Sequence, residues 1–194
     1  MRDTANQVPT ASQTVGPFFS IGLSPHNSDN FVPPQVPVGS KVVTLRGCVL
    51  DGDGSAVPDA VLEIWRADET GHYSDASSGR SHDDRGVPAG FARIPTNDHG
   101  EFAFQTIKPG AVQGAKGEIH APHLAVVVFM RGLLKHLLTR IYFPDEAANE
   151  IDAILAAVPA ERRNTLIAVS DGNQNELRWD IRLQGDGETV FFEA

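Results

Sequence analysis

The stretch IHAPHLAVVVF, residues 119–129, decides what kind of fold and site this sequence can form. The run AVVVF has the continuous apolar pattern of a buried β-strand, and His123 lies at its start. Residues two apart on a strand share a face about 6.6 Å apart, which suits two metal ligands. The position two residues after His123 is Ala125, which has no donor atom, and His120 is three residues away. The stretch therefore fits a metal site, the remains of one, or an ordinary strand that begins with a histidine.

Size and composition indicate an ordinary globular protein. The chain has 194 residues, of which 41% are hydrophobic and 21% charged, enough for one large domain or a domain with an arm. No apolar run approaches the length of a membrane span, and the polar start lacks the apolar core of a signal peptide. The single cysteine excludes an internal disulfide, so a cytoplasmic protein is expected. The formal charge of −9 argues against nucleic acid as a partner.

Residues 1–40 are expected to form an extended arm, and residues 41–194 a single β domain. The arm carries six of the 13 prolines and little periodicity, so a disordered tail is one interpretation. The segment TVGPFFSIGL, residues 14–23, argues against it, because so many apolar side chains need a surface to lie on.

Strand patterns dominate from residue 42 onward. Short apolar or alternating runs separated by turn residues occupy 42–51, 61–68, 91–95, 101–107, 123–132 and 133–143. Asn, Asp and Gly in TNDHG, residues 96–100, predict a hairpin between the runs that flank it. In ELRWDIRLQG, residues 176–185, alternation predicts one strand with an apolar face formed by Leu177, Trp179, Ile181 and Leu183.

A helix is expected over residues 145–157. Acidic residues lead this segment, Ile151, Ile154 and Leu155 recur at helical spacing, and Pro159 follows its end. The segment 159–169 is compatible with a second short helix. Many strands with one or two short helices near 145–165 predict an all-β protein, namely a β-sandwich.

The histidines and tyrosines do not form an obvious cluster in the sequence. Most of the seven histidines lie in turns, where a solvated side chain is expected. His136 falls in the predicted strand 133–143 and is expected in the core. Tyr142 is expected to pack in the same strand, and Tyr73 to cap a sheet edge.

Other reactive groups give no complete catalytic set. His82, Asp83 and Asp84 could form a carboxylate site, but adjacent acids in a loop rich in Gly and Ser are usually solvated. Cys48 lies within a strand and is expected to act as a small buried hydrophobe. The sequence has no G-x-S-x-G motif, phosphate loop or dinucleotide fingerprint. The residues alone therefore indicate that this chain is not a self-sufficient enzyme.

Arg131 ends the predicted strand that His123 begins, on the same face. It lies eight residues further on, about 26 Å away at strand rise, so the two cannot serve one compact site. An arginine at a strand end is usually solvated. Where strand ends meet another subunit, such a guanidinium could instead reach a carboxylate bound there.

Six blocks of the sequence, in order, resemble the intradiol ring-cleavage dioxygenases. They are SQTVGPFF (12–19), GCVLDGDGSAVPDAVLEIWRADETGHY (47–73), FQTIKPG (104–110), APHLAVVVFMRG (121–132), RIYFPDEA (140–147) and DIRLQGDGETVFFE (180–193). The resemblance implies a β-sandwich in a hetero-oligomer of α and β chains. It also implies a non-haem Fe(III) site in the β chain, where a small aromatic acid is cleaved with O₂.

The same resemblance implies that this chain has lost the iron site. Catalytic chains of the family hold iron with two tyrosines and two histidines. His123 fills the first histidine position as a leftover, while Ala125 stands at the second and Val112 and Arg80 at the tyrosine positions. Phenolates are hard anionic donors that suit a ferric ion, so one imidazole cannot replace the set.

The arm and Arg131 have a role that the resemblance implies. In α chains of this family, the QT-x-GP arm and the arginine of F-x-RG line the entry to the iron site of the β chain. The corresponding residues here, expected to contact substrate in the partner's site, are Thr14, Gly16, Pro17, Phe18 and Arg131. Phe18 stands where a tyrosine is familiar, so a hydroxyl is lost. The arm would then lie across the β chain.

A second interpretation is a binding module without catalytic function. The segment from Gly47 to Gly110 also resembles transthyretin-like and carboxypeptidase regulatory-like β-sandwich modules. Those modules are shorter and leave residues 1–40 and 119–194 unexplained.

Overall fold

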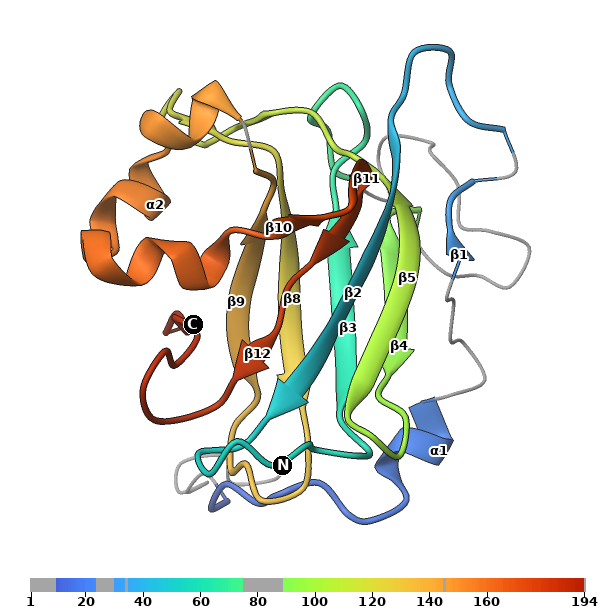
Figure 1. Cartoon of the computed structure of the whole chain (residues 1–194), viewed down its shortest axis with the longest axis vertical. Helices are drawn as coiled ribbons and strands as arrows, with labels where there is room; N and C mark the ends of the chain where they lie inside the picture. The colour runs from blue at the N-terminus through green and yellow to red at the C-terminus, as the bar shows by residue number, and fades with distance from the viewer. Residues whose placement is uncertain (1–9, 24–29, 34, 75–88, 145, 194) are drawn as a thin grey trace, which may run out of the picture.

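Two β-sheets packed face to face form the body of the protein (Figure 1). The computed structural model describes residues 10–23, 30–33, 35–74, 89–144 and 146–193. One sheet has the strand order β1-β5-β2-β11-β10, with β12 also paired to β2, and the other has the order β4-β3-β8-β9. The strands of the first sheet are β1 (Asn30–Phe31), β2 (Val42–Leu50), β5 (Glu101–Ile107), β10 (Val169–Asp171), β11 (Asn173–Arg178) and β12 (Ile181–Arg182). Those of the second are β3 (Val61–Arg66), β4 (Phe91–Pro95), β8 (His123–Phe129) and β9 (Leu137–Tyr142). The predicted β-sandwich is confirmed.

The core lies between the two sheets, and alternation along the strands explains it. In β2 and β5 every second side chain faces the other sheet, and in β8 the buried row is Leu124, Val126 and Val128. A second, smaller apolar cluster lies between the second sheet and the helical residues 147–166, and it includes Tyr142, Leu155 and Leu166. A short extra ladder joins β6 (Val112–Gln113) to β7 (Ile119–His120).

The hairpin predicted around residues 96–100 is wrong in its pairing. Gly100 turns the chain at a φ of +71°, and its amide donates to the Asn97 carbonyl, so the turn itself is present. β4 pairs with β3 and β5 pairs with β2, which places the two strands in different sheets. Turn residues predict a change of direction, but they do not determine which strand the chain then pairs with.

The single strand predicted at 176–185 is two short strands, β11 and β12, both parallel to β2. The break lies at Trp179 and Asp180. The Trp179 amide donates to the Arg46 carbonyl, and the Asp180 carboxylate accepts from the Cys48 amide at 2.9 Å. The predicted apolar face is confirmed for Leu177, Trp179 and Ile181, which are buried, whereas Leu183 is only half-buried.

The predicted helix 145–157 divides into η2 (Ala147–Glu150) and α2 (Ala153–Ala157). Asp152 causes the division, because its extended backbone lets its carboxylate cap α2 by accepting from the Leu155 amide. Ile151 is consequently 69% exposed, against expectation, while Leu155 is buried. The following segment forms η3 (Ala160–Leu166).

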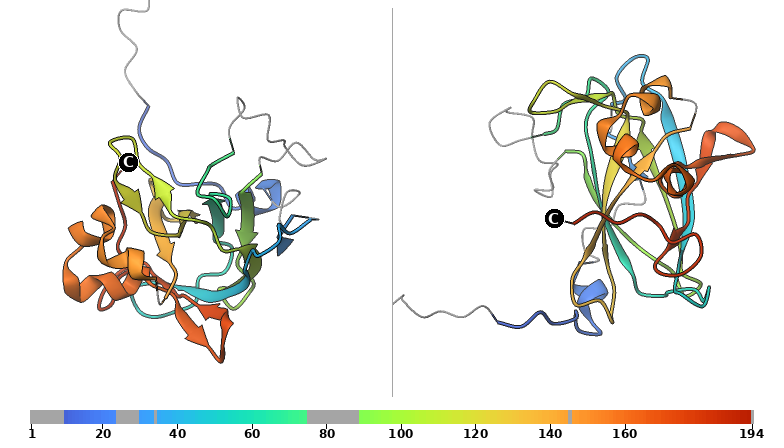
Figure 2. Two further views of the ribbon diagram at one scale, coloured as in Figure 1. Left: turned by 90° about the horizontal axis from the view of Figure 1, so that it is seen from above. Right: turned by 90° about the vertical axis from the view of Figure 1, so that its left-hand side faces the viewer.

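The predicted arm is partly structured. It contains α1 (Phe19–Leu23), and β1 pairs in parallel with β5, which places Phe31 in the core. The sandwich therefore includes residues before the boundary expected at 40/41. In the right-hand view of Figure 2, residues 10–23 of the arm, drawn in blue, extend beyond the lower end of the sandwich. Within the described ranges, no helix is long and apolar enough to cross a membrane.

Candidate functional site

The arm meets the sandwich at the loop between β8 and β9, residues 130–136. The Thr14 hydroxyl oxygen accepts a hydrogen bond from the Gly132 amide at 2.8 Å. Arg131 precedes that glycine, and its Nε donates to the Asp59 carboxylate at 2.6 Å. The structure thus brings Thr14 and Arg131, which are far apart in the sequence, to the same junction.

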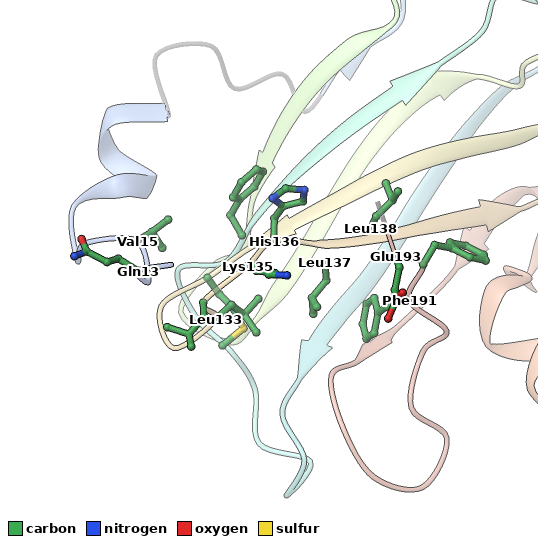
Figure 3. A pocket seen from close by; sticks show the side chains of 13 residues that line it. Gln13, Val15, Leu133, Lys135, His136, Leu137, Leu138, Phe191 and Glu193 are labelled. Atoms are coloured by element: carbon green, nitrogen blue, oxygen red, sulfur yellow. The ribbon is translucent and has the colours of Figure 1, made fainter. Parts of the chain in front are cut away.

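A groove of about 760 Å³ lies beside this junction (Figure 3). The close-up shows Gln13 and Val15 of the arm on one side of the loop and the C-terminal Phe191 and Glu193 beyond β9. Met130 and Leu133, on either side of Arg131 in the sequence, line the groove together with Phe129, Leu134, Lys135, His136, Leu137, Leu138 and Phe192. The groove is mainly apolar and open.

The other expected entrance residues lie on the outer side of the arm. Phe18 is 74% exposed, Pro17 is exposed, and a Cβ added to Gly16 would meet no atom within 4 Å. Ile21 of α1 is also 67% exposed. Phe18 and Ile21 therefore remain largely uncovered by the described part of their own chain.

His123 lies at the opposite end of β8 from Arg131, in a buried polar cluster. Its Nδ1 is 2.8 Å from the Ala121 carbonyl, which accepts the proton of that nitrogen. Its Nε2 is therefore the acceptor for the Tyr73 hydroxyl at 3.3 Å. Burial, reinforced by the charge of Arg140, lowers the pKa of His123 to about 4, so the imidazole is neutral at pH 7.

Arg140 faces the positions that a second histidine ligand would use. It is paired with Ala125 across the β8–β9 ladder, two residues along from the His123–Tyr142 pair and on the same face. Its Nη1 donates to the Tyr142 hydroxyl oxygen at 3.4 Å. Burial raises the pKa of Tyr142 to about 12 and also raises the pKa of Tyr73, and in both cases Arg140 opposes the shift. The cluster holds neutral phenols and a neutral imidazole beside a fixed cation.

The Asp152 carboxylate links this cluster to α2 by hydrogen bonds. Its Oδ2 accepts from the Ala121 amide at 2.8 Å, and its Oδ1 accepts from the Leu155 amide at 2.8 Å and the Tyr142 hydroxyl at 3.2 Å. The carboxylate is fully buried. Asp152 therefore joins the start of α2 to β9 and to Ala121, whose carbonyl orients His123.

Several predictions about single residues are corrected or fall outside the described residues. His136 is exposed, because β9 begins only at Leu137, so the expected core histidine is wrong. Cys48 is half-buried, with its thiol near the His99 carbonyl, and burial raises its pKa. Val112 lies half-buried in β6. Arg80, His82, Asp83 and Asp84 lie outside the described residues.

Sequence reasoning missed the partners of the expected residues. Tyr73, expected to cap a sheet edge, forms a hydrogen bond with His123. Arg140 and Asp59 were not singled out. A charged residue inside the apolar run LLTRIYF was the available signal for Arg140, and an aspartate after Pro58 in a turn was the signal for Asp59.

The fold and the sequence define an intradiol dioxygenase. The sequence profile of the family described as Dioxygenase matches residues 14–185, and the chain belongs to this family, which is iron-dependent. Among solved structures, the dioxygenase domain from Streptomyces sp. SirexAA-E is similar with a TM-score of 0.62 and 24% identity, covering 94% of this chain and 100% of that one. A mercury-inhibited catechol 1,2-dioxygenase from Acinetobacter sp. ADP1 also gives a TM-score of 0.62, at 19% identity over 82% of this chain and 58% of that one.

Curated relatives narrow the resemblance to one kind of chain. The protocatechuate 3,4-dioxygenase alpha chain of Burkholderia cepacia is 41% identical over 95% of this chain and 97% of that protein. The protocatechuate 3,4-dioxygenase alpha chain of Pseudomonas putida is 40% identical over 95% of this chain and 96% of that protein. The beta chain of B. cepacia is 30% identical over 79% of this chain and 68% of that protein. A short transthyretin-like module does not account for similarity over such lengths.

Proposed function

We propose that this chain is the metal-free α subunit of an Fe(III)-dependent protocatechuate 3,4-dioxygenase. The assembled enzyme cleaves protocatechuate between its two hydroxylated carbons, and both atoms of O₂ enter the product, 3-carboxy-cis,cis-muconate. The observation that carries the proposal is the match to two alpha chains over 97% and 96% of their lengths. The weaker similarity to a beta chain supports a hetero-oligomer built from related folds.

The residues of this chain do not fit a ferric ion. His123 is a neutral donor whose Nε2 is engaged by Tyr73, and Ala125 and Val112 supply no donor atom. Arg140 adds a positive charge to the same cluster, which opposes a second cation. Among the described residues, no group of three or more His, Cys, Asp or Glu side chains is placed to hold a metal. We therefore assign the iron to the β chain and a structural role to His123.

The role left to this chain is to shape the entrance of the partner's site. Arg131 is 55% exposed at the arm junction, so its guanidinium is available to the carboxylate of an aromatic acid. A charge-assisted pair of this kind, once partly desolvated by the partner, contributes about 1 to 3 kcal/mol. Thr14, Gly16, Pro17 and Phe18 would form the wall beside it, with Phe18 and Ile21 covered by the β chain.

The test of the proposal is iron content and visible absorption of the chain, first alone and then co-expressed with a β-type partner. Tyrosinate bound to ferric iron absorbs visible light, so colour reports the site. We expect a colourless isolated chain, and about one iron for each αβ pair in an active complex. Stoichiometric iron in the isolated chain would overturn the assignment.

The role of Arg131 is tested separately in the iron-loaded complex. Arg131→Ala should lower kcat/KM for protocatechuate by about 10- to 100-fold, with little effect on catechol, which lacks the carboxylate. Arg131→Lys keeps the charge but loses the planar guanidinium, so an intermediate effect is expected. Unchanged kinetics of Arg131→Ala with protocatechuate would contradict this role.

A further inference from the structure

Asp59 lies in a turn with an unusual backbone. Residues 57–60 form a tight turn before β3, in which Pro58 precedes Asp59 and Asp59 has a φ of +64°. Among the residues that the structure describes, Asp59 is the one non-glycine residue with positive φ. Glycine adopts this conformation without strain, whereas aspartate does so at some cost, so the carboxylate stands at a position where glycine is favoured.

A buried threonine fixes this turn from behind. The Thr96 hydroxyl donates to the Val57 carbonyl at 3.0 Å and accepts from the Ala60 amide at 2.9 Å. The Thr96 amide in turn donates to the Ala60 carbonyl at 2.9 Å. Both ends of the turn are therefore attached to the same side chain, and the position of Asp59 is set by the core rather than by a mobile loop.

From this fixed position Asp59 holds Arg131 through one nitrogen. Its Oδ2 accepts from Nε of Arg131 at 2.6 Å, and the two side chains are 26% and 55% exposed, respectively. Within the described part of the chain, the hydrogen bonds of this guanidinium go through Nε alone. Its two terminal nitrogens are left to form the paired contact that suits a carboxylate.

We propose that Asp59 is a positioning residue that presents the Nη1 and Nη2 groups of Arg131 to the carboxylate of an aromatic acid in the partner's site. This inference rests on the proposed function of Arg131. An unrestrained arginine would lose its rotamer freedom when substrate binds, and Asp59 has already restricted that freedom. Asp59 thereby favours ring substrates that carry a carboxylate over those that do not.

An exposed ion pair usually contributes little to stability, so the test must separate orientation from folding. Asp59→Gly removes the carboxylate and also relieves the backbone strain, so the variant should melt at the same temperature as the native complex or higher. Asp59→Asn retains a side chain that tolerates positive φ but removes the charge. Asp98→Asn is the matched control. Asp98 is exposed in the neighbouring 96–100 turn, so this substitution removes the same charge without changing the partner of Arg131.

The measurements are KM and kcat of the iron-loaded αβ complex for protocatechuate and for catechol. For Asp59→Gly we expect KM for protocatechuate to rise about tenfold, with kcat within about twofold and catechol kinetics unchanged. Asp59→Asn should lie between this variant and the native complex, and Asp98→Asn should match the native complex. The double variant Asp59→Gly/Arg131→Ala should be no worse than Arg131→Ala, because the two residues act as one unit.

The outcomes distinguish this inference from the proposed function. If Arg131→Ala impairs protocatechuate turnover but both Asp59 variants do not, the positioning role is wrong and the role of Arg131 stands. Equal losses for protocatechuate and catechol in the Asp59 variants would mean a general structural role and would also overturn the inference. If Arg131→Ala itself has no effect, the proposed role of Arg131 is wrong, and the inference is wrong with it.

Discussion

The Thr14 hydroxyl and the Gly132 amide join the N-terminal arm to the β8–β9 loop through a single hydrogen bond of 2.8 Å. This contact places the arm next to Arg131, and the side chains of Gln13 and Val15 then line the groove beside the loop. An exposed loop and a proline-rich arm would otherwise have few fixed contacts with each other. This bond therefore fixes the part of the arm around Thr14, whereas the pairing of β1 with β5 holds its later part.

The first prediction concerns this bond. Thr14→Val keeps the shape of the side chain but removes the acceptor, at a cost of about 1 kcal/mol. In the αβ complex, KM for protocatechuate should rise by about fivefold, less than in Arg131→Ala. Thr14→Ser retains the hydroxyl and should behave like the native protein. Identical steady-state kinetics for the Val and Ser variants would show that the arm is held by the partner instead.

The second prediction concerns the buried imidazole. The folded pKa of His123 is about 4, against an ordinary value of 6.5. Between these values the unfolded chain binds a proton that the folded chain does not, so stability rises with pH from 4 to 6.5 and is lost as pH falls. This group contributes on the order of 3 kcal/mol to that pH dependence.

His123→Gln removes this titration while keeping a polar side chain. The variant should be less stable at pH 7, and the difference between the thermal midpoints of the two complexes should shrink as pH falls from 6.5 towards 4. The comparison cancels the carboxylates, which titrate in both proteins. A difference that stays constant across this range would mean that the pKa of His123 is not lowered in the native fold.

Much of the fold follows from the sequence because it depends on local periodicity. The apolar run of β8 gives the correct strand, and the alternation of Leu177, Trp179 and Ile181 gives the correct buried face. The errors come from contacts between distant segments. Asp152 divides the predicted helix, and its carboxylate also accepts from the Ala121 amide and the Tyr142 hydroxyl, 31 and 10 residues away along the sequence. Such partners cannot be read from a helical pattern.

In the candidate site too, motifs could be read from the sequence, whereas contacts between distant residues could not. A resemblance in motifs placed Thr14 and Arg131 in one group, and the structure brings their segments together, although their roles remain a prediction. The contacts of Tyr73 with His123 and of Asp59 with Arg131 join residues 50 and 72 positions apart. Charge and turn type at Asp59 were visible in the sequence, but the turn is held by Thr96, which directly follows the neighbouring strand β4.

The third prediction concerns the close approach of β2 to the chain at Trp179. A Cβ built on Gly47 would lie 1.8 Å from the Trp179 carbonyl oxygen, and both are backbone positions held by hydrogen bonds. Gly47→Ala must therefore separate β2 from the β11–β12 segment, and we expect insoluble chain or a loss of several kcal/mol, on the order of 3 to 5. Gly22→Ala is the control, because an added Cβ there meets no atom within 4 Å. Soluble expression and the thermal midpoint measure both.

The fourth prediction concerns Asp152, which satisfies two backbone amides and a buried tyrosine hydroxyl at once. Asp152→Ala leaves three buried donors without their acceptor and removes the cap of α2, so a loss of about 3 to 5 kcal/mol is expected. Asp152→Asn should lose less than Asp152→Ala because it keeps one accepting oxygen, but its NH₂ group cannot replace the other. Glu150→Ala is the matched control, since this nearby acid is exposed. Thermal unfolding of the αβ complex ranks the variants. Equal midpoints for Asp152→Ala and Glu150→Ala would show that the helical segment is held by its apolar contacts with Tyr142 and Leu166 rather than by the carboxylate.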